Sequence, residues 1–324
     1  MDLRRLQVTG GGTFLVSLPI SWAKRNNLTR GSFVAVLERS DGSVTIDPKY
    51  PSSVELTSVS VPLSPSIERE IIGKYLLGYD IISVNSRERL GAGDRERIKK
   101  SVSLLMGLEI VEEDSHNVVL QCLLEPAAFP PEKILRREYL IAAGMHKESI
   151  SSFLELDRSL AASVIERDTE VNRLYFLLVR LLRTIIKNPK LSESTGIALI
   201  TCLDYRLVAS FIEALGDHAT EIAKIVRDSK LADISKETQS TLSKISETIY
   251  DIHSEAMAAL FSSNIGIAEN VVKKHSLVYR SLHDLEETTA QQDIKYFLAI
   301  SNITSALKRI CDCGKDIADL VVIP

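Results

Sequence analysis

Short apolar runs separated by glycines mark the first fifty residues of the chain. The elements predicted there are strands over residues 3–9 and 13–18, a helix over 20–26, and strands over 33–38 and 43–47. Gly10-Gly11-Gly12 and Asp41-Gly42 supply the turns within the two strand pairs, and Pro19 stands at the start of a helix, where proline is favoured. The segment is therefore predicted to fold as ββαββ.

A different alternation of strands and helices follows. The predicted elements are strand 54–61, helix 66–77, strand 80–84, helix 94–106, and strands 108–112 and 118–124. Ser64-Pro65-Ser66 predicts the start of the first helix, and Gly91-Ala92-Gly93-Asp94 predicts a loop that ends in an N-cap. We interpret this segment as a small α+β module that serves as a spacer or a dimer contact, with a small-ligand sensor as the alternative.

From Pro130-Pro131 onward the apolar residues have helical period, and Gly and Pro are nearly absent from segment interiors. The six predicted helices cover residues 132–156, 158–187, 192–228, 235–262, 265–290 and 293–322. Asp157 and Asn264 align as N-caps, and the residues after them match as Ala161/Ala268, Val164/Val271, Val171/Val278 and Arg173/Arg280. This internal repeat predicts two antiparallel three-helix bundles.

Composition adds a charge asymmetry to this division. The chain has 324 residues, 39 of them Lys or Arg and 43 Asp or Glu, yet residues 1–50 hold seven basic and four acidic side chains. The predicted domains are residues 1–50, 52–126, 130–228 and 232–324. The most apolar stretch, residues 174–186, contains Arg180 and Arg183, so we expect no membrane insertion and a cytoplasmic location. The four cysteines form no Cys-x-x-Cys pair and are expected as reduced thiols.

A row of acids on the predicted helix over residues 192–228 is the main candidate for chemistry. Glu213, Asp217 and Glu221 follow one another at four-residue spacing, so they stack on one helix face and repel one another. In the second repeat Asp312 and Asp316 stand under Asp217 and Glu221.

Two interpretations of this row are open. It is either a solvated acidic face or a site for a divalent or trivalent cation, with Asp168 on the preceding helix as a further ligand. Lys308 falls under Glu213, so the second site is expected to be weaker, remade or lost. Small residues beside the two rows, Gly216, Ala219, Gly314 and Ala318, are expected to let a neighbouring helix approach and add ligands.

The first fifty residues resemble the AbrB/SpoVT/MazE type of swapped-hairpin DNA-binding domain. The resemblance rests on "LPISWAK", "NLTRGSFVAV" and the closing "GSVTI". It implies a β-barrel shared by two chains, hence a homodimer or higher even oligomer, and DNA phosphate contacts in place of a merely solvated basic surface. The residues expected to bind DNA are Arg4, Arg5, Lys24, Arg25 and Arg30. A phosphate-cradling role for the three glycines is disfavoured, because no Gly-Lys-Ser/Thr follows them.

The helical part resembles the PhoU family of phosphate-uptake regulators, on "ERDTEVNRLYFLLVRLL" at 166–182, "IEALGDHATEIAKIV" at 212–226 and "LKRICDCGKDIADLV" at 307–321. This resemblance implies paired three-helix bundles that hold iron or zinc, or another divalent cation, on a Glu/Asp-x-x-x-Asp motif. Glu213 and Asp217 fit the motif, Glu221 extends it, and Asp312 with Asp316 give a shifted version. The whole chain is similar to an AbrB–PhoU fusion familiar in archaea: half of a swapped-hairpin barrel, a small α+β module and two helical bundles.

Three functional hypotheses follow. The leading one is a DNA-binding transcriptional regulator of phosphate uptake with a metal-binding sensory region. The alternative is an adaptor that regulates a phosphate transporter or a sensor kinase by protein contact, without binding DNA. A metal-dependent hydrolase is disfavoured because the sequence lacks His-Glu-x-x-His, Gly-x-Ser-x-Gly and a His-rich ligand set, so we expect no enzymatic activity.

Overall fold

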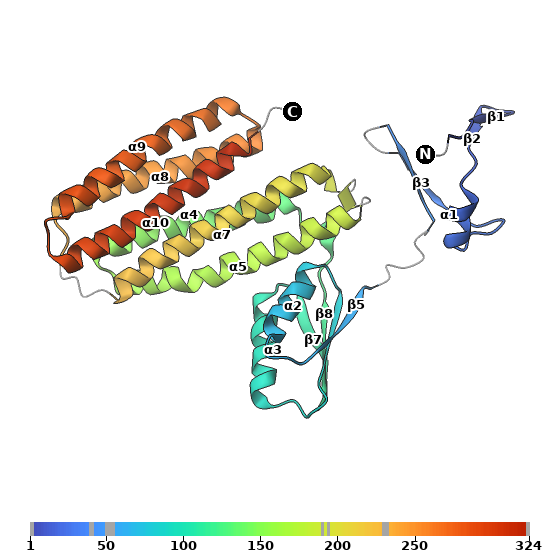
Figure 1. Ribbon diagram of the computed structural model, residues 1–324, viewed down its shortest axis with the longest axis horizontal. Helices are drawn as coiled ribbons and strands as arrows, with labels where there is room; N and C mark the ends of the chain where they lie inside the picture. Colours follow the sequence, from blue (N-terminus) through green and yellow to red (C-terminus); the bar gives the residue numbers. More distant parts are fainter. Residues whose placement is uncertain are drawn as a thin grey trace. The chain divides into compact units, whose positions relative to one another are not determined.

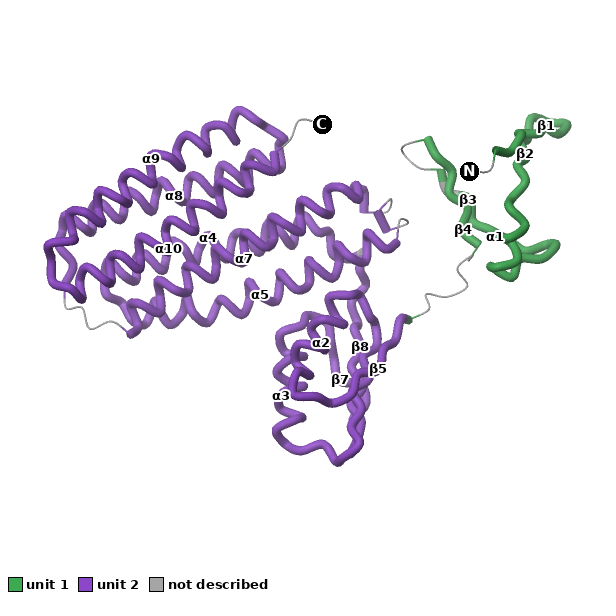
Figure 2. The backbone as a smooth tube through the Cα atoms, in the orientation of Figure 1, with its two compact units in different colours: residues 1–56 green, residues 57–324 purple. Residues whose placement is uncertain are grey.

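The computed structural model describes residues 3–38, 42–48, 56–188, 191–192, 195–228 and 233–321. Its Cα positions form two compact units, Met1–Leu56 and Thr57–Pro324 (Figure 2). Three positions named in the predicted turns and element ends lie outside the described residues: Asp41, Val54 and Val322. The division of the chain into four domains remains a prediction.

The first unit contains the predicted ββαββ order. β1 (Gln7–Thr9) pairs antiparallel with β2 (Thr13–Leu15), α1 covers Ile20–Arg25, and β3 (Ala35–Glu38) pairs antiparallel with β4 (Val44–Asp47). Gly11 and Gly12 have φ of 109° and 85°, a backbone region that side chains with a Cβ rarely adopt, so the first turn requires glycine there. Both predicted hairpins are confirmed, with shorter strands than expected.

This first unit has no interior of its own. Among the residues of the unit whose side chains the structure describes, none is buried. The large apolar side chains left exposed include Leu3, Leu6, Val8, Phe14, Val16, Ile20, Phe33, Val36 and Val44. Exposed apolar surface of this extent is typical of an interaction site.

The second unit begins with a four-stranded sheet and two helices. The elements are β5 (Ser58–Pro62), α2 (Ile67–Leu76), β6 (Ile81–Asn85), α3 (Ala92–Leu104), β7 (Leu108–Glu113) and β8 (Asn117–Cys122). The strand order is β5-β6-β8-β7, with β5 and β6 parallel and the other pairs antiparallel. Buried residues alternate along β6 and β8, and α2 and α3 cover that one face (Figure 1). The predicted α+β elements are confirmed.

The start of α3 differs from the prediction. Asp94 is not the N-cap: Gly91 holds that position, and Asp94 is the third residue of the helix, where its Oδ2 accepts a hydrogen bond from the Gly91 N–H at 3.1 Å. The carboxylate therefore reaches back to the cap, as in a capping box.

Six long helices make up the rest of the described chain. They are α4 (Pro131–Glu155), α5 (Arg158–Lys187), α7 (Leu199–Asp228), α8 (Lys236–Ser262), α9 (Ile265–Thr289) and α10 (Ile294–Asp319). Asp157 and Asn264 cap α5 and α9 through their side chains, as predicted. The predicted start at Ser192 is wrong, because Gly196 has a φ of 68° and the long helix begins only at Leu199. No helix among the described residues is both long and apolar enough to cross a membrane.

These helices pack as α4, α5 and α7, the first bundle, and α8, α9 and α10, the second bundle. One continuous apolar core runs through both, because α7 packs on α10 and α4 on α8 (Figure 1). Within the second bundle, Gly314 on α10 lets α8 approach closely: a Cβ there would lie 2.8 Å from Ile252 Cγ2 and 3.1 Å from the His253 backbone.

Two buried histidines lie between the bundles at matching positions of the repeat. His146 Nδ1 on α4 lies 3.1 Å from His253 Nε2 on α8. Tyr139 OH lies 2.9 Å from His253 Nδ1, and Ser246 Oγ lies 3.2 Å from His146 Nε2. Burial lowers the pKa of His146 to about 4 and that of His253 well below its usual range. Both rings are therefore neutral at neutral pH.

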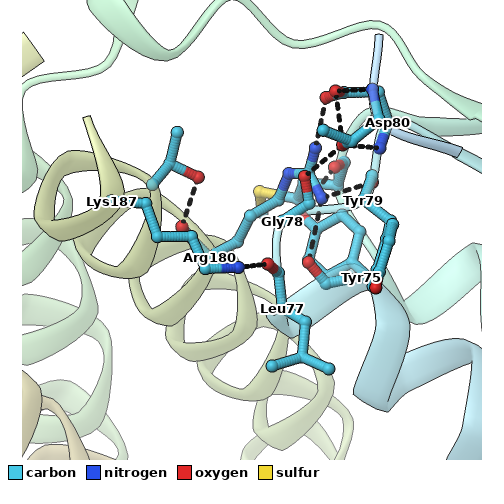
Figure 3. Close-up of polar contacts among 10 residues, drawn as sticks. Tyr75, Leu77, Gly78, Tyr79, Asp80, Arg180 and Lys187 are labelled. Carbon is cyan, nitrogen blue, oxygen red and sulfur yellow. Dashed lines mark hydrogen bonds and ion pairs between the residues drawn. The ribbon is translucent and has the colours of Figure 1, made fainter. Parts of the chain in front are cut away.

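The α+β module is joined to the first bundle at the C-terminal end of α2. Arg180 on α5 donates from Nη1 to the carbonyls of Tyr75 and Tyr79, at 2.9 and 2.7 Å (Figure 3). Its Nη2 donates to Asp80 Oδ1 at 3.1 Å, and Lys187 donates to a further carbonyl of the same region. Cations at the carbonyl end complement the helix dipole, so α5 anchors the module through charge as well as packing.

Candidate functional site

The structure brings two acids of the predicted row together with Asp168. Glu213 and Asp217 lie one turn apart on α7, and Asp168 on α5 shares a hydrogen bond with Asp217. Partial burial, and then the charges of Asp217 and Asp168, raises the pKa of Glu213 to about 7. Partial burial, and then the charge and hydrogen bond of Asp168, raises the pKa of Asp217 to about 6. This cluster therefore carries a repulsion near neutral pH that a bound cation would relieve.

Neutral donors orient Asp168. Asn172 Nδ2 donates to Asp168 Oδ2 at 3.1 Å, and Thr220 Oγ1 donates to Asp168 Oδ1 at 3.3 Å. These contacts fix the carboxylate against α7 without supplying a positive charge. The sequence analysis named Asp168 as a further ligand of the row. The structure places this carboxylate beside Asp217, and its role as a ligand stays a prediction.

Glu138 on α4 is a fourth acid that the sequence analysis missed. It is fully buried, and neither of its carboxylate oxygens has a hydrogen-bond partner. Burial, and then the charge of Glu213, raises its pKa well above the usual range. A signal was present in the sequence, because Glu138 occupies a position at helical spacing from the apolar residues Ile134, Leu135 and Ala142.

Glu221 acts on this cluster, since its charge raises the pKa of Asp217, and it also contacts two groups outside the cluster. Its Oε2 lies 3.0 Å from Arg309 Nη2 on α10 and 3.3 Å from His218 Nδ1 on its own helix. Glu221 thus connects the row of the first bundle to the motif helix of the second. His218 is half-buried, and burial lowers its pKa.

In the second repeat, side chains that can pair with a carboxylate surround the acidic row. His275 and Tyr279 stand at the positions of Asp168 and Asn172, and both contact Asp312: His275 Nε2 and Tyr279 OH each lie 2.8 Å from Asp312 Oδ1. Lys308 donates to both carboxylate oxygens of Glu286, at 2.9 and 3.0 Å. Asp312 therefore has two direct hydrogen-bond partners, whereas Asp217 faces Asp168, and the charge of Lys224 that favours its ionised form acts more weakly.

Asp316 resembles the first row more closely. Burial raises its pKa, with the nearby charges of Asp312 and Asp319 acting in the same direction. Lys315 opposes this shift, so a positive side chain adjoins this acid. The two copies of the motif thus present different chemistry on the same helical framework.

The small residues beside the rows admit apolar neighbours. A Cβ on Gly216 would lie 3.4 Å from Val171 Cγ1, and Gly314 packs on Ile252 and the His253 backbone. Ala219 and Ala318 are buried. The expected close approach of helices is confirmed, but the groups that enter at these two glycines are core side chains and backbone, so they add no carboxylate ligand there.

Among the described residues, the acidic side chains do not surround a single point closely enough to form a complete metal site. Within the part of the chain that the structure describes, no three His, Cys, Asp or Glu side chains are placed so that they could hold a metal ion between them. The four cysteines are buried and unpaired with one another, at positions 122, 202, 311 and 313. The lack of a three-ligand group among the described residues extends to Glu213, Asp217 and Asp168, so a cation at this cluster would be held by fewer than three of these carboxylates and would complete its coordination with water.

The five predicted DNA contacts all lie in the first unit and are exposed. Arg4 and Arg5 precede β1, Lys24 and Arg25 form the last turn of α1, and Arg30 follows in the loop before β3. Lys24 and Arg25 are adjacent residues on a helix, so their side chains point in different directions.

The two bundles match a known family along most of their length. A model of the PhoU domain matches residues 135–226 and again residues 242–321, which together are more than half of the chain. The chain belongs to the PhoU domain family. Each match coincides with one bundle, so the internal repeat corresponds to two copies of the PhoU domain, and the acids of the row lie inside the first match.

Two curated PhoU relatives share part of the chain. Both are named phosphate-specific transport system accessory protein PhoU homolog. The protein from Burkholderia is 28% identical over 160 residues, which is 47% of this chain and 66% of that protein. The protein from Rhizobium meliloti is 27% identical over 150 residues, which is 45% of this chain and 60% of that protein. The chain thus spans less than two thirds of either relative.

A solved structure shows the same fold. The phosphate transport system regulatory protein PhoU from Streptococcus pneumoniae superposes with a TM-score of 0.53 at 17% sequence identity. The superposition covers 59% of this chain and 91% of that protein. The PhoU fold is therefore shared, and residues outside the superposition are additions to it in this chain.

Proposed function

We propose that this protein regulates phosphate uptake. The observation that carries the proposal is the PhoU domain match over both bundles, which includes the destabilised Glu213–Asp217–Asp168 cluster. The names of the curated relatives, accessory proteins of a phosphate-specific transport system, support the same physiological role. The proposal involves no chemical step. A ligand binds to the bundles, and its binding alters what the rest of the protein contacts.

In this proposal the cluster of the first bundle holds a divalent or trivalent cation such as iron or zinc. Carboxylate oxygens suit such ions, and protons compete with them for Glu213 and Asp217. Because those pKa values are about 7 and 6, binding should strengthen steadily between pH 5 and pH 8. Asp312 and Asp316 would bind more weakly, since His275 and Tyr279 already satisfy Asp312.

Elemental analysis after incubation with iron(II) or zinc tests this site. The Glu213→Gln/Asp217→Asn variant should lose the bound metal. Glu247→Gln/Asp251→Asn is the matched control, because these two acids have the same four-residue spacing on α8 but are exposed and lie outside the cluster. Metal that is absent from the parent protein, or that is lost equally from both variants, would exclude the assignment.

The N-terminal unit is proposed to bind DNA as part of a dimer. Its support is the resemblance to swapped-hairpin domains, the five exposed basic residues and the exposed apolar side chains that a second copy would cover. Affinity for double-stranded DNA should fall with salt by about 0.9 log unit per log unit of salt for each phosphate contact.

A salt titration of DNA affinity with matched variants tests that proposal. Arg4→Ala/Arg5→Ala should reduce the slope, whereas Lys99→Ala/Lys100→Ala, two exposed neighbours on α3, should leave it unchanged. If the parent protein binds no DNA even at low salt, the adaptor is favoured instead. In that case the word accessory in the relatives' names points to protein contact with a transport component.

A further inference from the structure

A polar pocket of about 550 Å³ lies at one end of the second bundle. It is formed where α8 begins, α9 ends and α10 begins. On α9 its lining follows one helical stripe, Ser281, Asp284, Leu285, Thr288 and Thr289. The volume is within the usual range of small-ligand sites.

The hydroxyl groups of this stripe face the pocket as hydrogen-bond acceptors. Ser281, Thr288 and Thr289 donate their hydrogens to carbonyls of α9 itself, at 3.3, 3.0 and 2.8 Å. Ser235 Oγ likewise donates to Thr238 Oγ1 at 2.9 Å. Because these donors are already engaged, the oxygens offer lone pairs to a ligand, and a ligand rich in N–H donors fits them best.

The charged groups around the pocket have one sign. Asp233, Glu237 and Asp284 contribute carboxylates, and none of the described residues that line the pocket is basic. Tyr296 lines it as well, and its hydroxyl oxygen is buried without a hydrogen-bond partner. An aromatic ring beside carboxylates attracts a cation through its face, whereas phosphate would meet only like charge.

The repeat shows that this polarity belongs to the second bundle alone. The register that aligns Ala161 with Ala268 also pairs five polar lining residues of the second bundle with apolar residues of the first. The pairs are Ser281/Leu174, Asp284/Leu177, Thr288/Leu181, Thr289/Leu182 and Gln292/Ile185. In the first bundle all five apolar partners are buried in the core. The same helical end is filled with apolar side chains in the first bundle and surrounds a cavity with hydrogen-bond acceptors in the second.

We propose that this pocket binds a protonated aliphatic diamine or polyamine. The ammonium groups would contact the carboxylates of Asp284 and Glu237, and the methylene chain would lie against Leu285 and the Tyr296 ring. A bare metal ion is a poorer match, because most of the side chains that line the pocket are neutral. The pocket is separate from the Glu213–Asp217 cluster and does not depend on the proposed function.

Isothermal titration of the full-length protein with putrescine and spermidine at about 150 mM salt tests the proposal. One equivalent should bind, and 1,4-butanediol, which has the same chain without the ammonium groups, should not. Glu237→Gln/Asp284→Asn should weaken binding by tenfold or more, and Tyr296→Phe should weaken it to a smaller extent. Both acids are exposed, so circular dichroism should show an unchanged helical content for the double variant.

Two control variants separate this site from general attraction to an acidic protein. Glu247→Gln/Asp251→Asn removes two exposed acids from α8, and Glu213→Gln/Asp217→Asn removes those of the other cluster; both should bind the amines like the parent. Lack of amine binding at millimolar concentration would overturn the proposal. So would binding that survives Glu237→Gln/Asp284→Asn, or binding that falls equally in every acidic variant.

Discussion

At the scale of single residues, Glu138 has the surroundings least suited to its charge. It is fully buried on α4, its two carboxylate oxygens have no partner, and Glu213 lies close enough to raise its pKa further. The positive charge of Arg206 opposes this shift in pKa, but it acts more weakly than burial and Glu213. The protein therefore accommodates Glu138 in its protonated form.

Replacing Glu138 with Gln should stabilise the protein at alkaline pH. The folded state holds the proton above the usual carboxyl range, so stability is present at low pH and is lost as pH rises above about 4.5. At pH 8 the variant should be more stable by about 1–3 kcal/mol, and at pH 5 the difference should be small. Urea unfolding in the presence of EDTA measures both values.

Glu155→Gln is the control for that measurement, because Glu155 lies on the same helix but is exposed. It should change stability equally little at both pH values. A Glu138→Gln effect that is the same at pH 5 and pH 8 would mean that the carboxyl is charged throughout, and that its burial is compensated.

At the scale of helices, the repeat uses the same backbone for different interactions. α7 and α10 carry the motif, but Asp217 faces another acid whereas Asp312 faces His275 and Tyr279. α5 and α9 differ in the same way. The positions of α5 that match the pocket lining are apolar and buried, whereas the end of α9 lines the polar pocket. The helices fix positions, and a few substitutions decide what those positions bind.

Arg180→Ala should loosen the attachment of the α+β module to α5. The Arg180 side chain is 5% exposed, and its removal takes a charged donor from the Tyr75 and Tyr79 carbonyls and from Asp80. Asp80 keeps its hydrogen bonds from Thr57, and the Tyr75 carbonyl keeps the one from the Gly78 N–H. The cost should be about 2–4 kcal/mol in the free energy of unfolding. Arg183→Ala is the control, because that side chain makes one long contact, at 3.4 Å, to an exposed carbonyl.

Two readouts follow from the Arg180 change. Chemical denaturation gives the loss of stability, and limited proteolysis should cut faster between β8 and α4 in Arg180→Ala than in the parent or Arg183→Ala. Equal stability of the two arginine variants would show that the junction is held by apolar packing alone.

The histidine pair between α4 and α8 should make the protein sensitive to acid. The pKa of His146 is about 4 in the folded state, below its usual 6.5, so the unfolded state binds protons first. Stability should be complete above pH 6.5 and should fall by about 2 kcal/mol for this residue at pH 5. Thermal unfolding at pH 7 and pH 5 measures the loss.

His146→Gln should reduce that pH dependence at the expense of stability at pH 7, whereas His283→Gln should change neither, since His283 lies on the surface of α9 with its side chain 65% exposed. A pH dependence that persists in full in His146→Gln would assign the acid sensitivity to other groups.

At the scale of the whole molecule, the two units differ in how they are stabilised. The unit over residues 57–324 has continuous apolar cores, whereas the first unit exposes its apolar side chains. A segment of this size without an interior does not fold stably alone, and a second copy of the same segment is the simplest cover.

Phe14→Ser should dissociate the dimer expected of the full chain. Phe14 is 67% exposed in a single chain, and the dimer would bury it. Leu140→Ser on α4 is the matched control, because Leu140 is also 67% exposed but lies in a unit that has its own core. Light scattering at micromolar concentration should report a dimer for the parent and for Leu140→Ser, and a monomer for Phe14→Ser. A monomeric parent with ordered N-terminal strands would contradict the shared barrel.

Elements with strong periodicity and clear ends could be predicted from the sequence, and side-chain partners could not. Asp157 and Asn264 mark helix starts through local hydrogen bonds, so their role is visible in the sequence. The start of α7 was missed because it depends on the positive φ of Gly196, which the long apolar pattern concealed. Glu221 was assigned to the acidic row because spacing along one helix says nothing about Arg309 on another.

The contact between Glu221 and Arg309 has a thermodynamic consequence for the two repeats. Glu221 pairs with Arg309 while its charge also acts on Asp217, so moving it fully onto the acidic row would compete with that ion pair. A cation that draws Glu221 toward Asp217 would release Arg309, and any ligand that engages Arg309 would return Glu221 to the acidic row. Reciprocity requires the two effects to be equal in free energy. Through this single ion pair, a cation bound to the first repeat would change the affinity of the second repeat for a ligand of Arg309, and the reverse would also hold.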